Sequence, residues 1–169
     1  MEILIVGSII VALMVYASTK IKKQAALAYE PEVIETDDFI IEKPQGFLHP
    51  LNGEPGLAFE AYTKEFGTGE GRFLHQARAE LSAAGGKKLS RAAADIREAA
   101  DEIVLEAKLG GGGLRIDTIE TVGEASVEAF YDLQEKGGRV YCLRIAVLSE
   151  RKDEYMSRIL EMRESFQLK

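Results

Sequence analysis

The first hydrophobic pattern in the chain is an uncharged run near its N-terminus. From Ile3 to Thr19 there are seventeen residues without a charged side chain, and most of them are large and apolar. A membrane-spanning helix needs about 20 apolar residues, with about 17 as the lower end. We therefore predict a single transmembrane helix with a basic flank over residues 1–23.

This run differs from a cleavable signal peptide. A signal peptide starts with Lys or Arg, has a shorter apolar core and ends at a small-x-small site, whereas Glu2 carries the only charged side chain before this run. We expect the helix to remain as an anchor. The small residues Gly7, Ser8 and Ala12 would let a neighbouring helix approach closely. We expect the contact surface of the anchor at Gly7, Ser8, Val11 and Met14.

Three lysines at the end of the run predict its orientation. Lys20, Lys22 and Lys23 follow the apolar residues directly. Basic residues stay on the cytoplasmic side of a membrane, so the N-terminus is expected outside and the rest of the chain in the cytoplasm. Only the α-amine competes with the lysines, and the opposite orientation stays open.

Residues 24–38 read as an acidic linker. Pro31 interrupts the helical pattern, and five acidic side chains, the first of them Glu30, lie within residues 30–38. They lack the alternating Asp/Asn ligands and central glycine of a calcium-binding EF-hand loop. A solvated linker is therefore the better interpretation.

From residue 39 to 169 the spacing alternates between strand and helix periods. Alternation predicts strands at Phe39–Glu42 and around Phe59, each bounded by turn residues. Residues 71–84 switch to spacings of three and four, which predict a helix, and residues 87–109 do the same. The tail of the second segment, residues 101–109, also fits a strand, and periodicity does not decide between the two.

The last third of the chain has the clearest pattern. Two alternating runs flank "EKGGR", and glycines at 137 and 138 supply the positive φ of a tight hairpin turn. A final helix follows, with an apolar stripe from Tyr155 to Phe166. Strands, helices, hairpin and helix in this order predict an α+β fold, an antiparallel sheet flanked by helices in an α-β-α sandwich.

Both ends of this domain resemble a known superfamily. The strand "GRVYCLRIAVLSE" followed by "YMSRILEMRESFQL", which ends at Ser165-Phe166, resembles the end of PsbP-like and DcrB-like domains, and "IIEKPQGFLHP" resembles their first strand. The resemblance implies a small α-β-α sandwich that serves as an accessory or assembly subunit of membrane complexes without enzymatic activity. It also implies a domain outside the cytoplasm, in conflict with the lysine flank.

Composition excludes several function classes. The chain carries a formal charge of −7, and from Gln24 onward it carries −9, because three of 21 basic residues and one of 28 acidic residues precede that point. A surface this acidic does not suit nucleic acid. Cys142 is the single cysteine, which excludes an intrachain disulfide framework and a cysteine-rich zinc site.

No catalytic signature stands out. Four glycines in "LGGGGLR" lack the following Lys-Ser/Thr and helix of a phosphate-binding loop, so a flexible connector is the better interpretation. His49, His75 and Cys142 are the residues that an unrecognised enzyme would use, but their spacing matches no known zinc or nucleophile pattern. We therefore expect no catalytic residues, no metal and no cofactor.

The sequence thus favours a non-catalytic accessory or scaffold subunit, anchored in the bilayer and docked on an integral membrane protein complex. A membrane-tethered ligand-binding or sensing module is the first alternative, and an enzyme of unrecognised type is the second. Four residues at the hairpin tip are candidate docking points, together with the glycine loop: Lys136, Gly137, Gly138 and Arg139.

Overall fold

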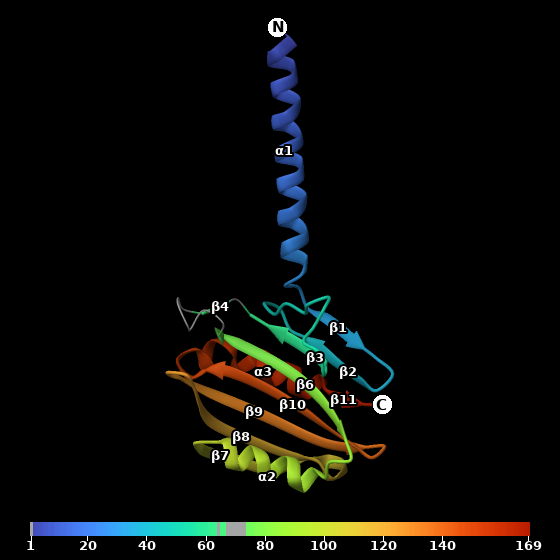
Figure 1. Ribbon diagram of the computed structural model, residues 1–169, viewed down its shortest axis with the longest axis vertical. Helices are drawn as coiled ribbons and strands as arrows, with labels where there is room; N and C mark the ends of the chain where they lie inside the picture. The colour runs from blue at the N-terminus through green and yellow to red at the C-terminus, as the bar shows by residue number, and fades with distance from the viewer. Residues whose placement is uncertain (1, 64, 67–73) are drawn as a thin grey trace.

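The computed structural model describes residues 2–63, 65–66 and 74–169 (Figure 1). A long helix, α1 (Glu2–Leu27), projects from a sandwich of strands and two further helices. The remaining elements follow in chain order: β1 (Glu32–Glu35), β2 (Phe39–Lys43), β3 (Leu57–Tyr62), β4 (Glu65–Phe66), β5 (Leu74–His75), β6 (Ala77–Gly85), α2 (Leu89–Ala99), β7 (Glu102–Lys108), β8 (Leu114–Val122), β9 (Ala125–Lys136), β10 (Arg139–Leu148), α3 (Lys152–Ser165) and β11 (Gln167–Leu168).

The main sheet is antiparallel and has the strand order β3-β6-β10-β9-β8-β7. Its centre is the hairpin of β9 and β10, in which Lys136 lies opposite Arg139 across the turn. Gly137 and Gly138 adopt φ of 60° and 72°, the left-handed values that a two-residue hairpin turn requires. The predicted hairpin is therefore confirmed. A smaller antiparallel sheet has the order β1-β2-β11.

Helices cover opposite faces of the main sheet, which confirms the predicted sandwich. On one face α3 and β2 pack against β3, β6 and β10 around Phe47, Ile145 and Ile159, which are fully buried. On the other face α2 packs with Ala93 against Ile116 of β8 and Leu133 of β9. Alternate residues of β9 therefore enter different cores, and both faces of this strand are apolar because both are covered.

The predicted helix over residues 71–84 is wrong where the structure describes it. Residues 77–85 form β6, which pairs with β10 through nine residues and with β3 on its other side. Residues 71–73 lie outside the described part. The predicted helix over residues 87–109 is right only as far as Ala99, and its tail is the edge strand β7.

The end of α1 is fixed to the sandwich by one buried lysine. Lys43 of β2 is 1% exposed, and its Nζ donates to the carbonyl oxygens of Ala28 at 2.8 Å, Glu30 at 2.7 Å and Phe47 at 3.2 Å. The N–H of Gly46 donates to the carbonyl of Tyr29 at 2.8 Å. The segment predicted as a linker thus contains the end of α1, this attachment and strand β1.

The N-terminal helix carries exposed apolar side chains along the part that the structure describes. Val11, Leu13, Met14, Val15 and Tyr16 are each at least 60% exposed. Among the described residues, no helix has both the length and the hydropathy that crossing a membrane requires. The transmembrane anchor over residues 1–23 and its orientation therefore stay predictions.

Candidate docking surface

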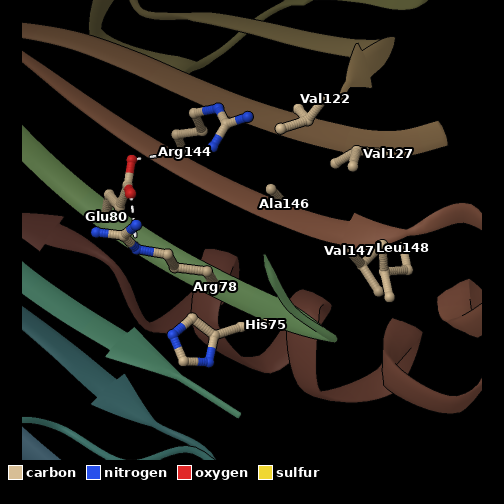
Figure 2. Close-up of a pocket in the computed structure, with 9 residues that line it drawn as sticks. All are labelled: His75, Arg78, Glu80, Val122, Val127, Arg144, Ala146, Val147 and Leu148. Atoms are coloured by element: carbon tan, nitrogen blue, oxygen red, sulfur yellow. Dashed lines mark ion pairs between the residues drawn. The ribbon is translucent and has the colours of Figure 1, made fainter. Parts of the chain in front are cut away.

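Among the described residues, α2 covers β8 and β9, and the neighbouring part of the same sheet face is open. A cavity of about 150 Å³ lies on this open part. Figure 2 shows its lining, which comes from β6, β8, β9 and β10 together with His75 of β5. The residues that line it are His75, Arg78, Glu80, Val122, Val127, Arg144, Ala146, Val147 and Leu148.

The cavity has an apolar end and a charged end. Ala146 lies opposite Arg78 in the pairing of β10 with β6, and Leu148 lies opposite Val127 in the pairing with β9. Residues directly opposite in an antiparallel pair share a face. The side chains of Ala146, Val127 and Leu148 lie at the apolar end, whereas Glu80 lies between Arg78 and Arg144 at the charged end (Figure 2).

The charged end is an ion-pair network in which both arginines are already paired. Arg78 contacts the carboxylates of Glu54 at 2.7 Å and Glu60 at 2.8 Å, and its Nε lies 2.8 Å from Glu80. Arg144 lies 2.8 Å from Glu120 and 3.9 Å from the other oxygen of Glu80. Four carboxylates surround two guanidinium groups, so the network carries a net negative charge and leaves little attraction for an anion.

Burial and hydrogen bonding tune the network next to α2. Burial alone raises the pKa of Glu120, but hydrogen bonds from Tyr131 and Arg144 outweigh it, and the pKa lies below its usual value. Burial, with the Glu120 hydrogen bond, raises the pKa of the Tyr131 phenol. Tyr131 therefore stays a neutral donor and Glu120 a charged acceptor across the physiological range.

A second ion pair lies on the opposite face, where it fixes α3 to the sheet. Arg163 of α3 and Asp132 of β9 are each buried, and Nη2 of Arg163 donates to Asp132 at 2.7 Å and to Asp117 at 2.8 Å. Arg115 contacts the other oxygen of Asp132 at 2.8 Å. Burial raises the pKa of Asp132, but the two arginines outweigh it and lower the pKa below its usual value.

The three residues considered for an enzyme are not brought together. Nδ1 of His49 lies 2.7 Å from the carbonyl oxygen of Glu60, and Nδ1 of His75 lies 2.7 Å from that of Thr63, so each nitrogen donates to a backbone acceptor. Cys142 lies opposite Ser82, seven residues beyond His75 along the chain, about 20 Å at the rise of a strand. Burial raises the pKa of the Cys142 thiol to about 11, which disfavours the nucleophilic thiolate.

Within the described residues, no group of three or more His, Cys, Asp or Glu side chains is arranged to hold a metal ion. The hairpin tip that was predicted as a docking point contacts its own chain. Lys136 donates to the carbonyl of Leu168 at 3.2 Å, and Arg139 lies 3.8 Å from Asp38. The lysines of the basic flank belong to α1, as do Gly7 and Ser8, whose surroundings lie outside the described residues.

The Ser-Phe element at the end of α3 has a clear packing role. The Ser165 hydroxyl accepts a hydrogen bond from the N–H of Glu42 at 2.9 Å and donates to the carbonyl of Met162 at 3.0 Å. Phe166 is 5% exposed and belongs to the core beneath the small sheet. The element joins the last helix to β2, so it is a structural signature and not a reactive one.

Comparison with solved structures shows what this fold is similar to. No protein-family model matches the chain, and no curated protein matches its sequence. Cyanobacterial PsbP from Synechocystis is similar over 83% of this chain and 94% of its own, with a TM-score of 0.55 and 11% identity. The Ran-binding protein Mog1p of Saccharomyces cerevisiae is similar over 83% and 96%, with a TM-score of 0.56 and 11% identity. The chain therefore has the α-β sandwich fold of PsbP and Mog1, which confirms the predicted resemblance at the level of the fold.

Proposed function

We propose that this chain is a membrane-anchored, non-catalytic accessory subunit whose sandwich docks on a larger membrane protein complex. The observation that carries the proposal is the attachment of α1. An uncharged run of seventeen residues lies in a helix that projects from the sandwich, and the carbonyls at its end are held by buried Lys43. A fixed exit of this kind suits a subunit that presents one defined face to a neighbour near the bilayer.

The size of the cavity favours docking over storage of a ligand. Sites for small molecules and cofactors enclose about 300–1,000 Å³, whereas this cavity has about 150 Å³. That volume accepts one large apolar side chain. The four glutamates that pair with Arg78 and Arg144 give the ion-pair network beside the cavity a net negative charge, so the proposed occupant is an apolar side chain of the partner with basic neighbours.

The anchor is tested by changing the apolar face of α1. Val11→Glu places a charge in the middle of the run, which costs about 2.5–3.5 kcal/mol in a membrane-inserted helix. Val33→Glu is the matched control, because Val33 of β1 is 62% exposed and Val11 is 60% exposed. We expect V11E to lower the membrane-bound fraction after alkaline extraction and V33E to leave it unchanged. Equal extraction of both variants would contradict the anchor.

Docking at the cavity is tested separately by filling it. Ala146→Leu adds apolar volume at its floor, and Ala83→Leu makes the same change at an exposed position of β6 outside the cavity. Burying a large apolar side chain contributes about 1.5–3 kcal/mol, so A146L is expected to weaken binding to the partner about 10- to 140-fold. If A146L and A83L bind the partner with equal affinity, the docking surface lies elsewhere.

The predicted orientation has its own test. Reversing the charges of Lys20, Lys22 and Lys23 removes the basic flank, which is the feature that favours a cytoplasmic domain. Protease is added to intact cells or to vesicles sealed with the cytoplasmic side inside. We expect it to leave the domain of the unchanged chain intact and to cleave the domain in a fraction of the molecules of the charge-reversed variant. Full protease access to the unchanged domain from outside would establish the opposite orientation.

A further inference from the structure

Strand β7 ends the main sheet, and its outer edge carries apolar side chains into solvent. Ile103, Val104 and Leu105 are 43%, 53% and 45% exposed. The strand has seven residues and contains no proline, and among the described strands its one partner is β8. An apolar edge with unpaired backbone groups is a template for pairing with another strand.

A hydrogen bond at the end of β7 shows which of its residues direct their backbone N–H and C=O groups away from β8. The N–H of Leu109 donates to the carbonyl of Gly113 at 2.9 Å, so at this residue the backbone faces β8. Leu109 itself is extended, with φ −91° and ψ 158°. Successive residues of an antiparallel strand direct their backbone groups to opposite sides. Glu106 and Lys108 therefore direct their N–H and C=O groups outward.

We propose that two copies of this chain pair antiparallel through β7, about a two-fold axis at Ala107. In this register Glu106 lies opposite the partner subunit's Lys108, and by symmetry Lys108 lies opposite the partner subunit's Glu106. Both are residues with outward backbone groups, so they exchange backbone hydrogen bonds while their side chains form ion pairs. Leu105 lies opposite the partner subunit's Leu109, which adds an apolar pair on each side of the axis.

Neighbouring registers lack this complementarity. A two-fold axis at Glu106 places two carboxylates opposite each other, and an axis at Leu105 carries the ladder into the bulge between Ile103 and Leu105. With the axis at Ala107 the bulged Val104 lies opposite the partner subunit's Gly110. A Cβ added to Gly110 would have no neighbour within 4 Å, so this turn offers room for a bulged strand.

The register predicts a specific cross-link. Residues opposite each other at a site without hydrogen bonds have Cα atoms about 4.5 Å apart, within the range of a disulfide. Ala107→Cys in the full chain, in mild detergent under mild oxidation, is expected to form linked dimers at least about tenfold faster than Ala83→Cys, an exposed β6 position. The raised pKa of Cys142 keeps its background low. Equal rates for the two variants would overturn the pairing.

Charge reversal tests the same register without a covalent bond. Lys108→Glu alone and Glu106→Lys alone each place like charges opposite each other, and we expect either variant to self-associate about 2- to 30-fold more weakly in sedimentation velocity. A mixture of the two restores both ion pairs and is expected to recover association. K108E leaves the pair of Arg97 and Glu106 intact, which separates this effect from a loss of folding. A mixture as weak as its components would refute the register.

Discussion

The buried lysine that holds the end of α1 permits a quantitative prediction. Lys43→Met keeps most of the apolar side chain but removes an ammonium that donates to three carbonyl oxygens. Hydrogen bonds from charged donors contribute about 1.5–3 kcal/mol each. Water replaces the lysine at Ala28 and Glu30, which are partly or largely exposed, but not at buried Phe47. The variant also no longer buries a charged ammonium group, which offsets part of the lost hydrogen-bond energy. We therefore expect K43M to lower the free energy of unfolding by about 2–4 kcal/mol.

Thermal unfolding of the full chain in mild detergent measures this loss. For a protein of this size, 1 kcal/mol corresponds to about 2–4 °C, so K43M is expected to lower Tm by about 4–16 °C. Amide exchange at residues 28–30 should also increase, because the carbonyl attachment is lost. Lys152→Met is the matched control, since Lys152 makes a surface ion pair with Glu128 that is worth at most about 1 kcal/mol.

The result that refutes this reasoning is a K43M variant as stable as K152M. It would mean that water satisfies the three carbonyls as well as the lysine does, and the end of α1 would no longer be fixed by this residue. If K43M has a lower Tm but normal amide exchange at residues 28–30, Lys43 stabilises the fold but does not hold the end of α1. The two measurements therefore separate the energetic claim from the positional one.

Three further predictions concern glycines and the buried ion pair. A Cβ on Gly113 would lie 2.7 Å from the carbonyl oxygen of Leu133, so Gly113→Ala should cost about 1–3 kcal/mol in urea unfolding, whereas Gly110→Ala should be close to neutral. Gly137→Val should cost about 1–2 kcal/mol because φ is positive there; an unchanged midpoint would contradict the turn. The pKa of Asp132 is lower in the folded chain than its ordinary value of 3.8. The ionised carboxylate therefore stabilises the fold above pH 3.8, and this stabilisation is lost as the pH falls through the folded-state pKa. Asp132→Asn should therefore be less stable than the unchanged chain at neutral pH, and the difference should shrink in acid; a constant difference would contradict the ion pair.

Local signals made some parts of this fold predictable from sequence. The hairpin of β9 and β10 combines two alternating runs with a Gly-Gly turn, and the final helix has a full apolar stripe. Both are specified by neighbours in the chain, and both are confirmed. The Ser-Phe element was informative because Ser165 and Phe166 join the last helix to β2.

The central segment was misread because its spacing fits two periods. Ala77 and Leu81 are four residues apart, a separation that places them on one face of a helix and also on one face of a strand. Arg78 and Glu80 alternate with them, and their pairing with β10 and β3 settles the strand. That pairing depends on strands distant in sequence, so spacing within residues 71–84 does not reveal it.

Buried charges were the other feature that sequence reasoning missed. Charged side chains are rarely buried without a partner, and the partners of Lys43 and Arg163 come from other elements, so nothing in their own segments predicts their burial. Asp132 did offer a signal, since it lies between Tyr131 and Leu133 in a run, residues 129–133, that is otherwise apolar or aromatic. The candidate cavity had no comparable signal, because it is formed by parts of four strands that come together only in the folded sheet.

The central claim is that the sandwich docks on a membrane complex from a fixed helical anchor. The most direct measurement is purification of the full chain through a C-terminal tag from native membranes in mild detergent, followed by native gel migration and mass spectrometry. We expect co-migration with one large complex at fixed stoichiometry, lost in the V11E variant and kept in V33E. Migration of the chain alone, as a monomer or as a dimer of its own copies, would contradict the accessory-subunit function.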